Sequence, residues 1–247
     1  MLPNHGKLTC TNCFANQSAV WGKTATETDG WRLEYAPGAW GSANPKTLVL
    51  GFSKGANQMQ KLATRAFDDI PFSGIRPNMS RILHRLGLLP LHEVIDSRIK
   101  SDEQDYAFGS LIRCSVSAKN PVTGKFEKSG DVIRKSCSAS APLDFIGKCT
   151  KQFLANLPPR LETVVMLSND DDYVDACYEQ MRKLHPDLKR INAVAYGNKQ
   201  VTFVHVIHPA GTSGRHIPDW LEATKGKQAS KRDMAIAALS ANNQFIV

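Results

Sequence analysis

The sequence lacks a long hydrophobic run. Among its 247 residues no stretch of about 18 consecutive apolar residues occurs, the length that a membrane-spanning helix needs. Its start, MLPNHGKLTC, also lacks the apolar core of a signal peptide. We therefore expect a cytoplasmic protein that is neither inserted into a membrane nor secreted.

Acidic residues are scarcer than basic ones. The chain has 23 Asp and Glu against 31 Lys and Arg, which gives a formal net charge of +8. Basic side chains along a phosphate backbone gain affinity by releasing condensed counterions. The charge therefore favours a nucleic-acid partner, although a basic surface that serves only solubility has the same composition.

Cysteine is also scarce, with six residues, and a reducing compartment disfavours disulfides among them. Cys10 and Cys13 form a Cys-x-x-Cys pair, a spacing that allows two thiolates to bind one metal ion or cluster. A redox role is the alternative, but such a pair normally follows a strand, and no strand pattern precedes Cys10. The pair favours a metal site if two further ligands exist.

Short apolar runs alternate with amphipathic stretches along the rest of the chain. We expect strands at 46–51, 106–114, 163–167 and 201–207, and helices at 78–88, 143–157, 172–184 and 217–240. This alternation predicts an α/β protein with a largely parallel sheet covered by helices on both faces. We expect one domain over 1–247, with a loop-rich lead-in at 1–43 and a long surface loop at 115–141.

The stretch VTFVHVIHPAGTSGRH, residues 201–216, is the strongest functional signal. Its apolar strand ends directly before His208, and Pro209 prevents the strand from continuing. Open α/β sheets bind their ligands at the carboxyl ends of parallel strands. His208 is therefore a candidate functional residue, and a histidine that only caps the strand is the alternative.

Taken in order, six motifs resemble the uracil-DNA glycosylase superfamily, most closely its iron–sulfur branch, families 4 and 5. The motifs are CTNC, LVLGFSKGAN, PFSGIRPNMSRIL, SLIRC, GKCTKQFLANLPPRLETVVML and VIHPAGTSGRH. The resemblance covers most of the chain. It implies a three-layer α/β/α sandwich with a central, mostly parallel four-stranded sheet, and a monomer that binds DNA.

The resemblance also implies a [4Fe–4S] cluster, and zinc is the alternative for the same thiolates. The implied ligands are Cys10, Cys13, Cys114 and Cys149. Because the family usually has fewer residues between its third and fourth ligands, Cys137 is an alternative to Cys149.

The remaining site residues follow from the same resemblance. His208 would donate a hydrogen bond to the base oxygen that gains charge, and Phe72 would stack on a base flipped out of DNA. The other implied residues are Phe52 and Ser110 against the base, Ser53 and Asn57 for the attacking water, and Thr212, Ser213, Arg215 and His216 in a loop that enters DNA.

Two departures from the family concern the water and the base. The first motif has no carboxylate to position water, so Asp68 or Asp69 is a possible substitute for Ser53 and Asn57. Ser110 stands where uracil-reading members have an Asn, and a hydroxyl cannot make the paired contacts of an amide.

We therefore expect a monofunctional DNA glycosylase for uracil, another deaminated base or a modified base. The last would suit defence against phages whose DNA is modified, and the others would suit base-excision repair. The alternative is a non-catalytic DNA-binding protein with a structural iron–sulfur or zinc site.

Overall fold

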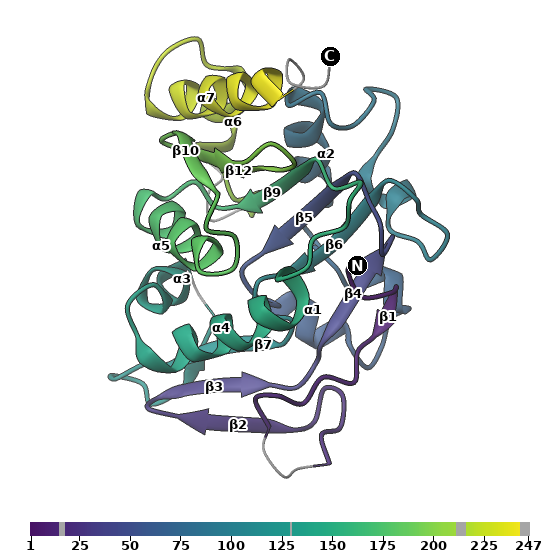
Figure 1. The fold of residues 1–247 in the computed structure, drawn as a ribbon. Coiled ribbons are helices and arrows are strands. Elements are labelled where there is room, and N and C mark those ends of the chain that lie inside the picture. The colour runs from purple at the N-terminus through teal and green to yellow at the C-terminus, as the bar shows by residue number, and fades with distance from the viewer. Residues whose placement is uncertain (15–17, 129, 211–215, 243–247) are drawn as a thin grey trace.

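A mixed sheet of eight strands runs through the computed structural model, which describes residues 1–14, 18–128, 130–210 and 216–242 (Figure 1). In sheet order the strands are β1 (Gly6–Lys7), β4 (Gly38–Gly41), β6 (Tyr106–Ser110), β5 (Thr47–Gly51), β9 (Thr163–Leu167), β12 (Thr202–Val206), β11 (Ala195–Gly197) and β10 (Lys189–Asn192). The four central strands are parallel, and two antiparallel strands extend each edge. The mixed α/β class is thus confirmed; the four expected strands form the parallel centre of the sheet, which has eight strands rather than four.

The central parallel strands are covered on both faces. All residues of β5, β6, β9 and β12 are buried, and their sequences TLVLG, YAFGS, TVVML and TFVHV are rich in β-branched and aromatic residues. Such uninterrupted apolar runs are typical of parallel strands with helices on both sides. The sequence places these strands correctly for this reason.

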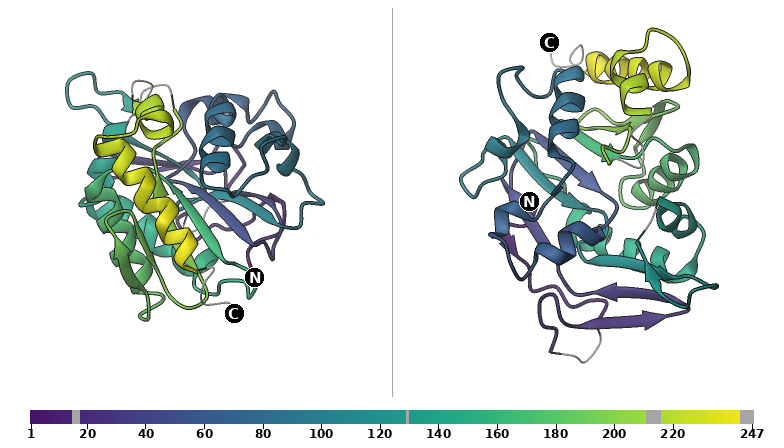
Figure 2. Two further views of the ribbon diagram at one scale, coloured as in Figure 1. Left: turned by 90° about the horizontal axis from the view of Figure 1, so that it is seen from above. Right: turned by 180° about the vertical axis from the view of Figure 1, so that it is seen from behind.

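Helices lie on both faces of the sheet (Figure 2). Alternate residues of β5 separate the two packing regions: Leu48 and Leu50 belong to one hydrophobic cluster, and Val49 belongs to the other. The first cluster includes α3 (Gly130–Ser136), α4 (Ser140–Leu154) and α5 (Asp171–Arg182); the second includes α2 (Arg76–Arg85), α6 (His216–Glu222) and α7 (Lys227–Asn242). None of the described helices is long and apolar enough to cross a membrane.

A second, antiparallel sheet corrects two loop predictions. Its strands, in order, are β2 (Ala25–Thr28), β3 (Trp31–Glu34), β7 (Ser115–Lys119) and β8 (Phe126–Glu127). Half of this sheet comes from the expected loop-rich lead-in and half from the expected surface loop at 115–141. The side chains of Trp31, Leu33 and Val116 are buried in the first hydrophobic cluster, the one that includes α4. Pairing with a distant strand therefore decides the structure of segments whose local patterns are weak.

One predicted helix is interrupted. The single helix predicted over 217–240 is divided into α6 and α7, and Gly226 precedes α7 with a φ of 103°. That backbone conformation is accessible to glycine without the steric cost that other residues meet. After β5, α1 (Ala56–Lys61) is only six residues long.

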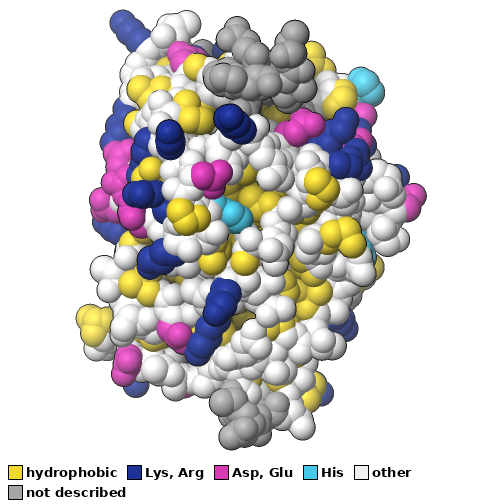
Figure 3. All heavy atoms as spheres, viewed as in Figure 1, with side chains coloured by type: hydrophobic (Ala, Val, Ile, Leu, Met, Phe, Trp, Pro, Cys, Tyr) yellow, Lys and Arg dark blue, Asp and Glu magenta, His cyan; other side chains and the backbone are white. Residues whose placement is uncertain are grey.

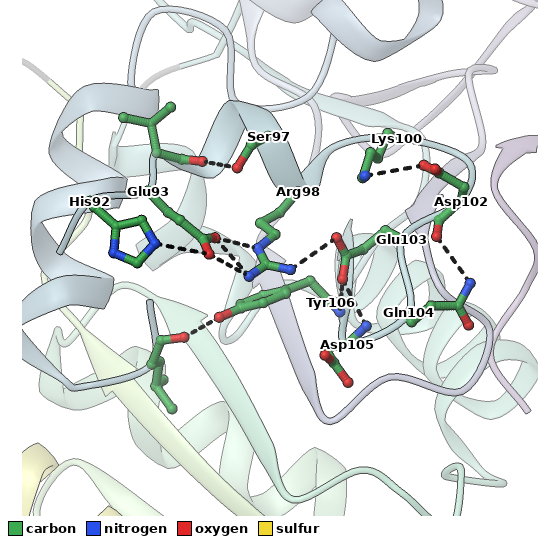
Figure 4. A network of polar contacts seen from close by, with 12 residues as sticks. His92, Glu93, Ser97, Arg98, Lys100, Asp102, Glu103, Gln104, Asp105 and Tyr106 are labelled. Carbon is green, nitrogen blue, oxygen red and sulfur yellow. Dashed lines mark hydrogen bonds and ion pairs between the residues drawn. The ribbon is translucent and has the colours of Figure 1, made fainter. Parts of the chain in front are cut away.

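The connection into β6 is fixed by the polar network of Figure 4. The Arg98 guanidinium donates to both oxygens of Glu93 at 2.7 and 2.9 Å, and it lies 3.6 Å from buried Glu103. Glu103 also accepts the backbone N–H of Tyr106, whose hydroxyl donates to the Leu88 carbonyl. This network holds the start of the strand whose far end contributes to the functional site.

Candidate functional site

A cavity of about 1130 Å³ opens at the carboxyl ends of the four parallel strands. Residues that line it at or after these strand ends are Gly51 and Phe52 for β5, Ser110 for β6, Ser168 and Asn169 for β9, and His208 for β12. Parallel α/β sheets bind ligands at this edge. The volume is slightly above the roughly 300–1,000 Å³ of ordinary small-molecule pockets, so the cavity has room for an organic group of that size.

Basic side chains outnumber acidic ones around this cavity. The basic lining residues are Lys54, Lys128, Arg134, Lys225, Lys227 and Lys231, and the acidic ones are Asp170, Asp171 and Asp219. Figure 3 shows Lys and Arg side chains spaced around an area where hydrophobic side chains and a histidine reach the surface. The cavity is therefore suited to a ligand that combines an apolar or aromatic part with negative charge.

His208 lines the cavity in one defined tautomer. Its Nδ1 accepts a hydrogen bond from the Ala210 backbone N–H at 3.2 Å, so in the neutral ring the proton is on Nε2. Burial lowers the pKa of His208 to about 4, which keeps the ring neutral near pH 7. Asn78 donates to the Pro209 carbonyl at 3.1 Å and so ties this turn to α2. His208 thus offers a neutral N–H donor whose orientation is fixed by the backbone.

Phe72 lies in the cavity wall with an unusual backbone. Its φ of 54° is in the left-handed region, which is uncommon for an aromatic residue and costs of order 1–3 kcal/mol. The ring meets Phe108 edge to face at 6.2 Å, and a Cβ on Gly51 would be 3.6 Å from it. The surrounding structure therefore holds this ring in one place despite the strain. Phe52 also lines the cavity, with its ring edge against Tyr173.

Ser110 presents an acceptor to the cavity rather than a donor. Its hydroxyl donates its only proton to the Ile112 carbonyl at 2.7 Å. The lone pairs of Oγ can then accept a hydrogen bond, but the group cannot also donate one. A ligand that binds Ser110 is expected to present an N–H or O–H.

The residues predicted to position water are divided between the cavity and the surface. Ser53 and Asn57 line the cavity, although Asn57 is largely exposed to solvent. Asp68 and Asp69 do not line it; Asp68 instead lies 2.9 Å from His5. The expectation that one of these two carboxylates replaces the missing one is therefore not supported by their position.

Sequence reasoning missed Asn169 and Asp170, which follow β9. Asn169 is buried, its side-chain amide donates to Gln228 at 2.8 Å, and its carbonyl accepts from Lys231 at 2.5 Å. Asp170 lines the cavity and forms no ion pair within the described residues. The rule that ligands bind at the ends of parallel strands applies to β9 as it does to β12, and it was a usable signal for both residues.

The predicted DNA-binding loop is described only in part. Thr212, Ser213 and Arg215 lie outside the described residues. His216 begins α6, lines the cavity, and lies 3.7 Å from Asp219. Nearby, hydrogen bonds from Lys231 and Lys227 hold the pKa of Asp171 below its usual value. This ion-pair group fixes the start of α5 against α7.

Four cysteines from three distant parts of the chain come within electrostatic reach of one another. Besides burial, negative charge on Cys149 and Cys10 would raise the pKa of Cys13. Charge on Cys149 and Cys13 would raise the pKa of Cys114, and charge on Cys10 would raise that of Cys149. Asn12, within the Cys-x-x-Cys pair, also donates to Gln152 of α4 at 3.4 Å. The four cysteines that the resemblance implies as ligands are thus close enough to influence one another's pKa.

Burial makes these thiols hard to ionise without a bound cation. It raises the pKa of Cys13 and Cys114 to about 12, and it also raises the pKa of Cys149. Backbone N–H groups of Ala36 and Arg113 hydrogen-bond to the sulfur atoms of Cys114 and Cys149, respectively, which favours the thiolates. Sulfur atoms with such donors are typical of thiolate metal sites.

The residue types of this group suit a metal site, but the side chains are not arranged around one point. No group of three or more His, Cys, Asp or Glu side chains within the described ranges forms a ready-made metal site. Four cysteines within electrostatic range of one another are nevertheless the residue type that binds a [4Fe–4S] cluster or structural zinc. Cys137 interacts instead with Asp170 and Asp172, and its sulfur approaches the Ile133 carbonyl at 3.4 Å. This location favours Cys149 over Cys137 as the fourth donor.

No protein-family model matches this sequence, and no curated protein matches it significantly. We therefore infer the function from the cavity, the cysteine group and the order of the motifs.

Proposed function

We propose that this protein is a monofunctional DNA glycosylase. It takes a base flipped out of DNA into the cavity, hydrolyses the N-glycosidic bond and leaves an abasic site. The three-layer α/β/α arrangement of the uracil-DNA glycosylases would accommodate the helices found on both faces of the sheet. The observation that carries the proposal is the neutral His208, with its proton on Nε2, at the carboxyl edge of the sheet.

His208 is suited to stabilise the departing base. Cleavage of the glycosidic bond leaves the electron pair on the base, so negative charge develops on its carbonyl oxygen. A neutral, preoriented N–H can donate to that oxygen without a change in protonation state. Phe72 would stack on the same base and offset part of the cost of flipping, which is of order a few kcal/mol.

Water would attack the sugar carbon from which the base departs. Ser53 and Asn57 line the cavity and could orient it, as the sequence predicts. Asp170 is a cavity carboxylate with no ion pair in the described chain, and it is the residue type that accepts a proton from water. We therefore add Asp170 to the candidates for water activation.

Ser110 restricts which base can bind, because its hydroxyl can only accept a hydrogen bond from the ligand. Its hydroxyl is committed to a backbone carbonyl, so the base must present a donor there. Uracil and other deaminated bases have a ring N–H, and cytosines modified at C5 keep an exocyclic amine. The large cavity favours a bulky modified base, as expected of an enzyme that acts on modified phage DNA.

The four thiols would hold a [4Fe–4S] cluster, with zinc as the alternative. When bound, such a group supplies a structural cross-link and no chemistry of base release. Cys10 and Cys13 anchor the lead-in, Cys114 follows β6, and Cys149 belongs to α4. The cross-link also supports the cavity, because the backbone of Lys54 donates to the Cys114 carbonyl at 3.3 Å.

A panel of modified duplexes tests the activity. Purified protein is incubated with DNA that contains uracil, hypoxanthine, hydroxymethylcytosine or glucosylated hydroxymethylcytosine, and abasic sites are then cleaved with alkali. We expect strand breaks at one class of base, and a loss of about 10²–10³-fold in rate for His208→Ala with DNA binding retained. His92→Ala, which changes an exposed histidine, is the control. No breaks on any duplex, together with tight DNA binding, would support the non-catalytic alternative.

The pH profile of base release gives a second readout of the same experiment. A histidine with an ordinary pKa would produce a change in rate near pH 6.5. Because the pKa of His208 is lowered to about 4, we expect no step from its titration between pH 5.5 and 8.

A further inference from the structure

Arg113 is buried without a matching anion. It is 2% exposed, and its Nε and Nη1 have no hydrogen-bond partner in the described structure. The guanidinium fits over the backbone of Gly109, where a Cβ would be 1.6 Å from Nη1, and lies 5.4 Å from the Phe153 ring. Gly109 thus leaves space for a buried guanidinium, yet two of its nitrogen atoms have no hydrogen-bond acceptor among the described residues.

Lys54 brings a second buried cation to the same place. It is 2% exposed, its Nζ donates to the Arg113 carbonyl, and it lies 5.2 Å from the Trp40 ring. No carboxylate within the described ranges forms an ion pair with either residue. Two buried cations without a carboxylate partner, one of them bonded to the backbone carbonyl of the other, are costly in a protein interior, since desolvation and mutual repulsion act together.

Within the described residues, the groups near these cations that can become negative are cysteines. In their thiolate form Cys114 and Cys149 would favour the charged form of Lys54, and Cys149 would favour that of Arg113. Four thiolates carry a charge of −4, and either Zn²⁺ or an oxidised [4Fe–4S] core adds +2, so the loaded site carries −2. Arg113 and protonated Lys54 together carry +2, which balances the charge of the loaded site, whereas without the metal group burial lowers the pKa of Lys54 to about 7.

We propose that Lys54 and Arg113 are the built-in countercharge of the four-cysteine site and stabilise its loaded form. This inference rests on the metal group assigned to Cys10, Cys13, Cys114 and Cys149 above, but not on base release. The two cations stabilise the anionic, loaded site and destabilise the metal-free chain. They also favour addition of an electron when the group is a cluster, because reduction makes the site more negative.

Replacement of Arg113 by Met tests the proposal, since Met keeps the length and apolar volume of the side chain. Arg113→Met, Lys54→Met, Arg113→Lys and wild type are purified anaerobically, and bound iron, sulfide and zinc are measured together with absorbance near 400 nm. Loss of metal to a chelator is followed over time. The control is Arg232→Met, because Arg232 is also buried but pairs with Asp233 and with backbone carbonyls.

We expect at least tenfold faster loss of metal from Arg113→Met and Lys54→Met, with the rate largely restored in Arg113→Lys. Metal-free Arg113→Met should unfold at a higher denaturant concentration than the metal-free wild type, the reverse of the order in the loaded proteins. If the wild type holds a cluster, its midpoint potential should fall in both Met variants. The Arg232→Met control should retain metal like the wild type.

Equal destabilisation of loaded and metal-free Arg113→Met, with unchanged metal retention, would reduce Arg113 to a packing role and overturn the proposal. A wild-type protein that binds neither iron nor zinc would overturn both the metal site and its countercharge. Neither result depends on base release, so the glycosylase assay remains an independent measurement.

Discussion

Arg98 and Arg113 stand at opposite ends of the same stretch of chain and differ in their partners: Arg98 is half-buried beside carboxylates, whereas Arg113 is buried without one. Arg98 leads into β6 and contacts two carboxylates, Glu93 and Glu103, at 2.7–3.6 Å. Burial lowers its pKa, but the hydrogen bond to Glu93 and the two negative charges more than compensate, so that the pKa of Arg98 is raised. Arg113 follows β6 with no carboxylate, and burial lowers its pKa to about 10, partly offset by Cys149.

The polar network of Arg98 has all of its partners within the chain, whereas that of Arg113 lacks an anion. The chain supplies every partner that Arg98 needs, so its network can form whenever the protein folds. The partners of Arg113 are thiols that burial keeps neutral, and they become anions only when a cation binds them. An unsatisfied buried charge thus indicates a missing ligand more directly than an empty cavity does.

The largest effect is expected at the completed network. Arg98→Met leaves Glu103, which is almost fully buried, without its cation, and should lower the free energy of unfolding by about 3 kcal/mol. The loss should be the same with and without metal, as measured by urea denaturation. Arg160→Met, which breaks an exposed pair with Asp105, should cost no more than about 1 kcal/mol. If the loss of stability in Arg98→Met depended on metal, the Arg98 network would not be independent of the cysteine site.

A methyl group at Gly109 should have an intermediate effect. The added Cβ would overlap the Arg113 guanidinium, so Gly109→Ala should cost about 1–3 kcal/mol through overpacking. The double variant Gly109→Ala/Arg113→Met should recover part of this loss in the metal-free protein, and a double-mutant cycle measures the coupling. Strict additivity of the two changes would mean that the guanidinium does not occupy this position.

Metal removal should have the smallest and most local effect. Hydrogen exchange of the amides around Cys114 and Cys149 should become about tenfold faster, or ~1.4 kcal/mol less protected. Exchange around Glu93 to Tyr106 should stay unchanged, because that network contains no thiol. Uniform loss of protection across both regions would instead indicate that the metal group stabilises the whole fold.

The candidate site could be anticipated only where its residues carry a local signal. His208 was found because a strand pattern ends directly before it, and Cys10 and Cys13 because their spacing is distinctive. Asn169 and Asp170 were missed because the strand-end rule was applied to β12 and not to β9. Asp68 and Asp69 were proposed from their closeness to Phe72 in the sequence, yet they do not line the cavity.

The sequence by itself determined the four central strands, most of the helices and the histidine at the end of β12, because periodicity and turn residues act over a few neighbouring positions. Tertiary structure alone decided the eight-stranded order, the second sheet, the His208 tautomer and the meeting of four cysteines with two buried cations. Those features depend on which distant segments become neighbours. Local patterns cannot specify such pairings, since each one is selected by the burial and hydrogen bonding of the folded chain as a whole.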